Sequence, residues 1–318
     1  MNIVRVIPKR SFFLALLFLI LVLLATLPIY GPNYTIVLLT GILLYIVLTL
    51  SWAFFSGPTR YISLASAAFF GVGMYTSAIL GKVLPLLVVI GIGGLASFCL
   101  ALLAGALTLR LRGMYFIMFT FGLVMLMRYV VLWWEDHISG TIGRFVILVD
   151  NTTIYYVMFV IFVMALLTAY FIRRSRLGLA LQSIGENEEA AAHSGVNVTL
   201  VKVITFAISA FFMGAAGAIM ATRWTYIDPS IAFNVLYSFM PVLMAIFGGM
   251  GQLYGPIIGA AIFAYLEEVL ITRFPYYYML LFGIILVVVI LYLPNGFVGL
   301  VQKWWKGGLA GQHANTRR

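Results

Sequence analysis

The chain has 318 residues, of which 64% are hydrophobic and only 9% are charged, and its mean hydropathy is +1.12. A soluble domain carries about 25% charged residues because it must solvate its surface, so this composition excludes a soluble enzyme. In a membrane protein, the net charge of +10 is typical of cytoplasmic anchoring and not of nucleic-acid binding. The apolar runs are continuous and do not alternate in polarity as barrel strands do. The sequence therefore predicts an all-α, polytopic transmembrane helical bundle embedded in a lipid bilayer.

The apolar segments predict about ten spans of about 20 residues each. They form a single transmembrane domain over residues 1–318, which ends in a short basic tail at 301–318. The third and eighth segments are interrupted by Gly or Pro, so we expect these spans to be partly discontinuous. In chain order, the expected spans are Phe12–Tyr30, Thr35–Phe55, Tyr61–Leu80, Val83–Leu109, Met114–Trp134, Ile154–Ile172, Leu200–Thr222, Phe233–Gly248, Pro256–Thr272 and Tyr276–Leu293.

The distribution of Lys and Arg predicts which ends of the spans face the cytoplasm. With the N-terminus in the cytoplasm and one crossing per span, 14 of the 19 basic residues fall on the cytoplasmic side. This asymmetry agrees with the positive-inside rule, and an even number of spans also places the basic C-terminal tail inside. We therefore expect a multi-pass protein with both termini in the cytoplasm.

The sequence indicates no residues suited to catalysis or to metal binding. Cys99 is the single cysteine, so no intrachain disulfide or thiolate cluster is possible, and the three histidines lie far apart. A phosphate-binding loop needs Gly-x-x-x-x-Gly-Lys followed by Ser or Thr, whereas the only Gly-Lys pair, Gly81–Lys82, is followed by Val83. We therefore expect no catalytic residue, no metal site and no cofactor bound by this chain, and any ATP would be hydrolysed on another chain.

The segment 173–198 is too polar to span a membrane, yet it carries strong helix signals. Ser175 is expected to cap a first short helix over Leu177–Ile184, with Gly185 as its terminator. Asn187 is expected to cap a second helix, because acidic residues follow it in the first turn. On the predicted orientation this segment is cytoplasmic.

Leu177, Leu181 and Ile184 recur at helical spacing and form one apolar stripe on the first of these helices. Such a stripe has to be buried against something. In one interpretation the helix lies at the lipid interface, anchored by neighbouring arginines; in the other it docks on a cytoplasmic partner. The arginines are Arg173, Arg174 and Arg176. The pattern by itself favours neither interpretation.

The segment 173–198 resembles the cytoplasmic coupling loop of the permeases of branched-chain amino-acid ABC importers. The family commonly has Gly-Gln or Gly-His where this chain has Ala65–Ser66. Four further segments match that family in order: its small-residue third span at 63–80, its Arg-x-Arg-Gly-x-Tyr-Phe motif at 110–121, its Gly-rich element at 248–260 and its closing Pro-x-Gly turn at 293–300. Each motif is weak singly, but the ordered set is specific and extends from the third span to the last.

This resemblance implies a transport subunit of a bacterial or archaeal inner membrane and not an enzyme. Such a permease forms the translocation pathway with a second, similar permease. Two ABC ATPase subunits drive it, and an extracytoplasmic binding protein delivers the substrate. The resemblance favours Leu, Ile and Val as substrates; urea, short amides and other amino acids remain alternatives, and ribose-type permeases are more distant relatives.

By the same resemblance, the first cytoplasmic helix would sit in a groove of an ATPase subunit, with acidic residues pairing at the rim. Replacing Leu181 with Asp is then expected to uncouple transport from ATP hydrolysis while leaving the protein inserted. The residues expected to couple the chain to the ATPase are Leu177, Leu179, Leu181, Ile184, Glu186, Glu188 and Glu189.

Polar and small residues inside the spans are candidates for lining the pathway and for helix packing. A Ser or Thr often bonds a carbonyl of its own helix, so each taken alone is more often structural. The candidates for pathway lining are Ser63, Ser66, Thr76, Ser77, Tyr237 and Ser238. Gly251, Gly255 and Gly259 share one face of a continuous helix and would permit close packing, whereas Pro256 favours a break near Gly255.

An ion-coupled secondary carrier that works alone is the main rival hypothesis. It needs charged groups at the bilayer midplane and often an internal repeat. Glu267 and Glu268 are expected about one turn from the outer end of their span, where they would reach the headgroups or pair with Arg273. A non-transporting membrane anchor is a third hypothesis, for which broken, Gly-rich spans are excessive.

Overall fold

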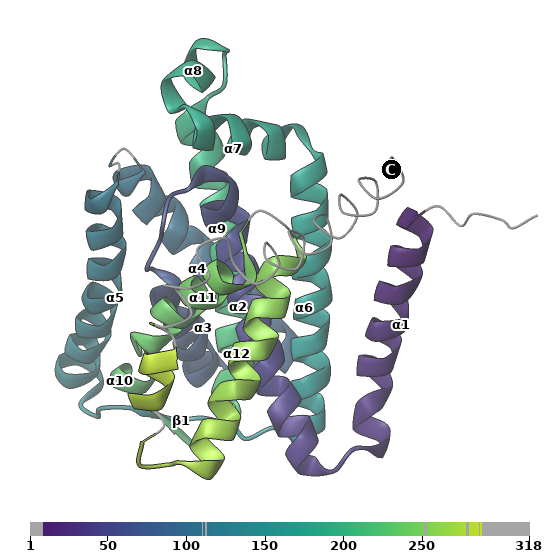
Figure 1. The fold of residues 1–318 in the computed structure, drawn as a ribbon. Coiled ribbons are helices and arrows are strands. Elements are labelled where there is room, and N and C mark those ends of the chain that lie inside the picture. The colour runs from purple at the N-terminus through teal and green to yellow at the C-terminus, as the bar shows by residue number, and fades with distance from the viewer. Residues whose placement is uncertain are drawn as a thin grey trace, which may run out of the picture.

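The computed structural model describes residues 9–109, 111, 113–250, 253–277, 280–285 and 287. Within these residues, helices account for almost all regular structure (Figure 1), and the all-α prediction is confirmed. The strands are β1 (Arg144–Phe145) and β2 (Tyr226–Ile227), and η1 (Glu135–Ser139) is a π-helical turn. The helices are α1 (Lys9–Tyr30), α2 (Asn33–Thr59), α3 (Ser66–Leu80), α4 (Leu86–Thr108), α5 (Met114–Trp134), α6 (Asn151–Arg174), α7 (Arg176–Glu186), α8 (Glu188–His193), α9 (Val198–Ala221), α10 (Pro229–Ala232), α11 (Leu236–Gly248) and α12 (Tyr254–Arg273).

Seven helices in the described part of the chain are long and apolar enough to cross a membrane. They are Asn33–Thr59, Leu86–Thr108, Met114–Ser139, Asn151–Arg174, Val198–Ala221, Pro229–Gly248 and Tyr254–Arg273. Two shorter apolar helices, Leu21–Tyr30 and Ser66–Leu80, match the first and third expected spans. These helices confirm a polytopic membrane bundle. Half of the tenth expected span, Tyr276–Leu293, lies outside the described residues, so the total of ten stays a prediction.

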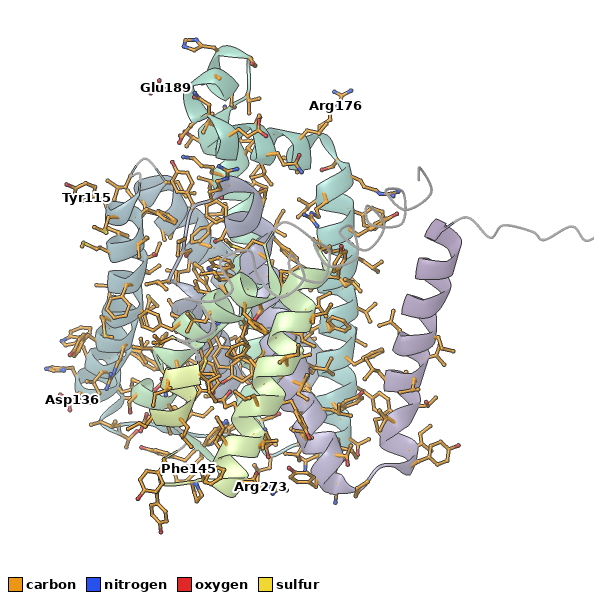
Figure 2. All side chains as sticks on the ribbon, viewed as in Figure 1. Tyr115, Asp136, Phe145, Arg176, Glu189 and Arg273 are labelled. Atoms are coloured by element: carbon orange, nitrogen blue, oxygen red, sulfur yellow. The ribbon has the colours of Figure 1, made fainter. Side chains whose placement is uncertain are left out.

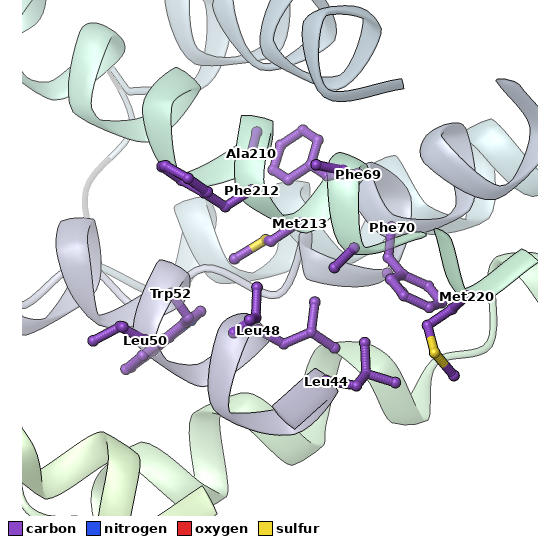
Figure 3. Close-up of a cluster of buried hydrophobic side chains, with 14 of the residues drawn as sticks. Leu44, Leu48, Leu50, Trp52, Phe69, Phe70, Ala210, Phe212, Met213 and Met220 are labelled. Carbon is purple, nitrogen blue, oxygen red and sulfur yellow. The ribbon is translucent and has the colours of Figure 1, made fainter. Parts of the chain in front are cut away.

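Helices α2, α3 and α9 form the centre of the bundle (Figure 3). α2 has no charged residue and is apolar on every side, which is typical of a buried helix. The central contact includes Leu48 and Trp52 of α2, Phe69 of α3 and Met213 of α9, each at most 2% exposed. α4 packs on α3 and α9, while α6 and α12 pack on α2. α1 stands apart on the outer side of α6 (Figure 1).

The close contact between α3 and α9 depends on glycine. At Gly73, a Cβ atom would lie 1.9 Å from the carbonyl oxygen of Gly214. At Gly217, it would lie 2.0 Å from the carbonyl oxygen of Phe70. Small residues let helix backbones approach each other in lipid, where no hydrophobic force drives helices together. The two central helices therefore touch through their backbones.

The third expected span is helical only in part, although its glycines are not the cause: α3 continues through Gly71 and Gly73, and the break lies at the start of the span. α2 ends at Thr59, and Arg60 takes a left-handed conformation with a φ of 60°. Tyr61–Ala65 are not helical, and α3 begins at Ser66, whose side chain is buried. The start of α3 therefore lies inside the bundle. The eighth expected span, Phe233–Gly248, is not divided: α11 runs without a break from Leu236 to Gly248 and contains Pro241, so the predicted interruption there is wrong.

The two ends of the bundle carry different structures. α7 and α8 project from one end, and η1 and the sheet lie at the other (Figure 1). Arg176 and Glu189 lie at the α7–α8 end, whereas Asp136 and Arg273 lie at the sheet end (Figure 2). The structure thus separates Arg176 from Arg273, as the predicted arrangement requires. β1 pairs with β2 in antiparallel register, with Arg144 opposite Ile227 and Phe145 opposite Tyr226.

Gly73→Ala is expected to destabilise the protein, because the added methyl group would collide with the backbone of α9. Overpacking of this kind costs about 1–3 kcal/mol. The matched control is Gly91→Ala on α4, where a Cβ atom meets nothing within 4 Å. Thermal unfolding of the purified protein in detergent should show a lower midpoint for Gly73→Ala alone. Equal midpoints for both variants would contradict the backbone contact.

Candidate functional site

The polar segment predicted from the sequence folds into α7 and α8, together called the α7–α8 element below. Asn187 caps α8, as predicted, because its side chain accepts hydrogen bonds from the backbone N–H groups of Glu189 (3.0 Å) and Ala190 (3.1 Å). Ser175 precedes α7 without a side-chain cap; its hydroxyl donates to the carbonyl oxygen of Ile172 at 2.8 Å. Local capping chemistry therefore separates the two helices.

α7 rests directly on the ends of α6 and α2. A Cβ atom at Gly178 would lie 2.3 Å from the carbonyl oxygen of Ile172, and one at Gly185 would lie 2.0 Å from that of Pro58. Gly185 is inside α7, which continues to Glu186, so the prediction that Gly185 terminates the helix is wrong. The glycine is needed for contact with α2 and not for ending the helix.

The apolar stripe of α7 is buried within the chain. Leu181 is 0% exposed and Ile184 3%, and both belong to a cluster with Ile172 of α6 and Val201 of α9. Leu177 packs against this cluster. The bundle itself therefore buries the stripe, and neither lipid nor a partner is needed for that purpose. The expectation that Leu181→Asp leaves the protein intact is corrected, because the new carboxylate would lie in an apolar cluster.

The outer face of α7 is available to another molecule. Leu179, which was also among the expected coupling residues, is 66% exposed. Arg176, Gln182 and Glu186 lie on the same side of the helix and are exposed, because their spacing of three or four residues repeats the helical turn. Glu189 of α8 is exposed at the same end (Figure 2). The predicted coupling residues thus divide into a buried group and an exposed group.

A buried ion pair joins α8 to α9. The Nζ atom of Lys202 lies 2.8 Å from Oε1 of Glu188 and donates to the carbonyl oxygen of Leu109 at 2.9 Å. The Lys202 side chain is 1% exposed and that of Glu188 19%. A buried ammonium group needs a counter-charge, so Glu188 serves inside the chain and not, as expected, at the rim of a partner.

Tyr61 completes this network from the non-helical segment of the third span. Its hydroxyl donates to Oε2 of Glu188 at 2.5 Å and accepts from Nζ of Lys202 at 3.3 Å. Nζ of Lys202 also lies 4.5 Å from the centre of the Tyr61 ring, where a cation is attracted to the ring face. The network therefore links the α7–α8 element with the broken span.

Sequence reasoning missed this network because Tyr61 and Lys202 are 141 positions apart. One signal was present. Lys202 lies within the otherwise apolar start of α9, and a lysine there is rarely buried without a partner. That signal predicts a partner but does not identify it.

The non-helical segment and the first turn of α3 obtain hydrogen bonds from three neighbouring helices, because backbone groups inside a bilayer must be satisfied by the protein. A side chain of α5 accepts from an N–H group of the segment, one of α11 accepts from an N–H group in the first turn of α3, and one of α2 donates to a carbonyl group of the segment. The bonds run from Leu64 N to Thr120 Oγ1 (3.0 Å), from Ala67 N to Ser238 Oγ (3.1 Å) and from Trp52 Nε1 to the Ser63 carbonyl oxygen (2.8 Å). The non-helical segment is therefore held in place by specific hydrogen bonds inside the bundle.

A small cavity lies beside the start of α3. Four serines contribute to its lining: Ser56, Ser63, Ser66 and Ser209. Its volume is about 10 Å³, which accommodates about one water molecule. Within the described residues, the hydroxyls of Ser56 and Ser66 have no hydrogen-bond partner. The cavity is thus a polar spot inside an apolar core.

The structure brings some of the predicted pathway residues together and leaves others apart. Ser63, Ser66 and Ser238 gather at the start of α3. Thr76 bonds the carbonyl oxygen of its own helix at Val72 (2.8 Å). Ser77 is buried further along α3, and the Tyr237 ring packs on Phe70, with 4.4 Å between ring centres. The assignment of these residues to a pathway stays a prediction.

The Gly-rich element packs α12 against α11. A Cβ atom would lie 2.1 Å from the carbonyl oxygen of Gly249 if placed on Gly255, and 2.2 Å from that of Met244 if placed on Gly259. The chain breaks before α12, which begins at Tyr254, so a continuous helix through all three glycines is excluded. Gly251 lies outside the described residues.

The two in-span glutamates bind tyrosines of α2. Oε1 of Glu267 accepts from the hydroxyl of Tyr45 (3.5 Å), and Oε1 of Glu268 accepts from that of Tyr34 (3.4 Å). The expected pairing with Arg273 is therefore replaced, in the described part of the chain, by bonds to α2.

Among the described residues, no group of three or more His, Cys, Asp or Glu is placed to hold a metal ion.

The apolar bundle, its broken central span and the ordered element at one end define a polytopic helical membrane protein. A family model for the branched-chain amino acid transport system / permease component matches residues 34–290. The chain belongs to this family, whose members are transport components.

Three relatives illustrate the similarity. The high-affinity branched-chain amino acid transport system permease protein LivM of Escherichia coli K12 is 26% identical over 96% of this chain and 80% of its own length. The permease protein LivH of the same organism is 30% identical over 46% of this chain and 48% of its own. The ribose import permease protein RbsC of Haemophilus influenzae is 28% identical over 38% of this chain and 40% of its own. No solved structure gives a significant match.

Removing one partner of the Lys202–Glu188 pair is expected to destabilise the protein more than removing both. Lys202→Met leaves a carboxylate without its counter-charge, which costs about 3 kcal/mol or more. Lys202→Met combined with Glu188→Gln leaves neutral groups and should recover much of that loss. Thermal unfolding in detergent of the two single variants and the double variant measures the difference. Additive losses would contradict a direct pair.

Leu181→Asp is expected to impair folding far more than Leu179→Asp, although both place a carboxylate on α7. The first buries the charge in the apolar cluster and should sharply lower the yield of folded protein. The second leaves it in solvent and should change the unfolding midpoint little. Size-exclusion chromatography and thermal unfolding measure both effects. A stable Leu181→Asp protein would contradict the burial of the stripe.

Proposed function

We propose that this chain is a membrane-spanning permease subunit of an ATP-driven ABC importer for Leu, Ile and Val. The observation that carries the proposal is the alignment with LivM permeases over almost the whole chain. The partial alignment with LivH supports a sister permease of similar fold, with which the chain would form the translocation pathway. The chain would act as one domain over residues 1–318 in a bacterial or archaeal inner membrane.

The α7–α8 element is proposed as the site where an ATPase subunit binds. Its buried face is fixed to α2, α6 and α9, and its outer face, with Leu179 and Glu186, is exposed. In the proposed orientation, this end and both termini face the cytoplasm. The coupling loop at 173–198 and the basic tail at 301–318 would then share that side, and an extracytoplasmic binding protein would deliver substrate at the sheet end.

The geometry supports a mechanism in which the chain converts a push on α7 into movement of its spans. α7 has backbone contact with the ends of α2 and α6 at Gly185 and Gly178. A rigid displacement of α7 by the ATPase therefore acts on both helices with no soft side chains between them. Because α2 lies at the centre of the bundle, its displacement can alternate access to the pathway. ATP would be bound and hydrolysed on the partner subunits, and this chain would bind no cofactor.

Other substrates remain within the proposal's scope. Urea, short amides and other amino acids are alternatives, and the partial alignment with RbsC extends the comparison to a ribose permease. An ion-coupled carrier is the rival from another class, and Glu267, bonded to Tyr45 inside the bundle, is the group it would use. Uptake abolished by an ion uncoupler but not by ATP depletion would favour that carrier.

The proposed docking face is tested with Leu179→Asp, which should leave the protein folded and weaken its binding to the ATPase subunits. Loss of a hot-spot residue at an interface costs about 2 kcal/mol or more, about 30-fold in affinity, and Leu179 is proposed as such a residue. Ile142→Asp is the control, because Ile142 is similarly exposed and lies two residues before β1. Co-purification with the ATPases and ATP-dependent uptake of radiolabelled leucine against urea are measured in parallel.

Loss of both ATPase binding and leucine uptake in Leu179→Asp, with Ile142→Asp retaining ATPase binding, is the expected result. If Leu179→Asp binds the ATPase as the wild type does, the outer face of α7 is not the site where the ATPase binds. Uptake of urea and not of leucine would redirect the substrate assignment.

A further inference from the structure

Besides the backbone contacts at Gly178 and Gly185, the α7–α8 element touches the bundle in two chemically different ways. One is the apolar cluster around Leu181, which attaches α7 to α6 and α9. The other is polar: Glu188, the first residue of α8, binds the hydroxyl of Tyr61 at 2.5 Å. Tyr61 belongs to the segment that connects α2 with α3. The second contact therefore reaches the broken span, which the first does not touch.

The Tyr61 side chain is held from several sides. Its ring packs edge-on against Phe116 and is tilted towards Phe55, with ring centres 5.4 and 6.4 Å away. Lys202 binds the hydroxyl and also lies over the ring. Lys202 is almost completely buried and bound to Glu188. The hydroxyl of Tyr61 is therefore hydrogen-bonded to two side chains whose positions are fixed. The ring and the hydroxyl thus fix the start of the connecting segment.

The connecting segment is short and leads to the interior. From Tyr61 to Ser66 it covers five residue steps, at most about 18 Å when fully extended. Its backbone is tied at Leu64 to Thr120, and Ala67 in the first turn of α3 is tied to Ser238. The serine-lined cavity adjoins the same turn. Because the segment is short and tethered, a displacement of Tyr61 is transmitted to the start of α3.

We infer that Tyr61 is a positioning residue that transfers movement of α8 to the start of α3. Glu188 and Lys202 hold its hydroxyl, and the connecting segment carries the displacement to the cavity beside Ser66. This inference rests on the proposed function for the source of the movement, which is the ATPase on α7 and α8. It adds a second route, to α3, beside the backbone contacts of α7 with α2 and α6.

Tyr61→Phe isolates the contact, because the ring and its packing remain and only the hydroxyl is lost. The ion pair between Lys202 and Glu188 also remains. Tyr155→Phe is the matched control: its hydroxyl donates to the carbonyl oxygen of Leu24 at 2.7 Å, between α6 and α1 and away from α8. Each variant therefore removes one tyrosine hydroxyl and its hydrogen bonding.

The first measurement is hydrogen exchange of the purified chain in detergent, which needs no partner. In Tyr61→Phe, the amide hydrogens of Leu64 and Ala67 should exchange about tenfold faster, as the loss of one anchoring hydrogen bond allows. In Tyr155→Phe they should exchange as in the wild type. Unchanged exchange in Tyr61→Phe would overturn the inference, whatever the protein transports.

The second measurement is the number of leucine molecules taken up per ATP hydrolysed by the complete complex in liposomes. Tyr61→Phe should lower this ratio several-fold while ATP hydrolysis continues, and Tyr155→Phe should leave it unchanged. A purely structural contact would lower the amount of active complex but not the ratio, so an unchanged ratio also overturns the inference. Absence of ATP-driven uptake in the wild type would instead refute the proposed function, and the exchange result would still decide whether Tyr61 fixes the segment.

Discussion

In the centre of the bundle, the chain between α2 and α3 is not helical, so its amide groups need partners that a continuous helix would have supplied. A bilayer offers none, because hydrocarbon neither donates nor accepts hydrogen bonds. Thr120, Ser238 and Trp52 reach the break from three different helices. The positions of α2, α5 and α11 around α3 thus agree with one requirement, that backbone groups at this interruption find partners within the protein.

The same interruption determines how the rest of the bundle packs. α3 has only 15 residues, so it starts inside the protein and cannot be held by contacts at both membrane surfaces. Its backbone contact with α9, through Gly73 and Gly214, provides the missing support at short range. α9 in turn carries Lys202, whose ammonium group ties α8 to Tyr61. The central helices and the element at the bundle end are therefore one mechanical unit.

The sequence was a good guide to some features that depend on local chemistry, although Ser175 does not cap α7 with its side chain as expected. Continuous apolar runs predict spans because hydrocarbon selects them, and Asn187 predicts a cap because its side chain reaches the next turn. Gly and Pro inside the spans were a poor guide to breaks, because α3 continues through Gly71 and Gly73 and α11 continues through Pro241. Features that depend on tertiary contact were misjudged. The stripe with Leu181 looks the same in sequence whether a partner or the bundle buries it.

Charge pairing was equally beyond sequence reasoning. Glu188 resembles any acidic residue in the first turn of an exposed helix, where the helix dipole favours it. Its burial beside Lys202 depends on how α9 approaches Tyr61, a contact between segments far apart in the chain. Glycine was ambiguous for a similar reason: Gly185 has the local signature of a helix end, yet it lies where α7 crosses the end of α2.

That crossing sets a dimension of the molecule. Where two helices meet through side chains, a substitution by a larger or smaller residue can change the distance between the two helix axes. At Gly185 and Gly178 there is no spacer, since the carbonyl oxygens of Pro58 and Ile172 occupy the space of a Cβ atom. The height of α7 above the spans is therefore at its lower limit and can only increase. The distance of α7 from the ends of α2 and α6 is therefore the same in every copy of the protein, and a partner that binds α7 would meet it at a fixed position.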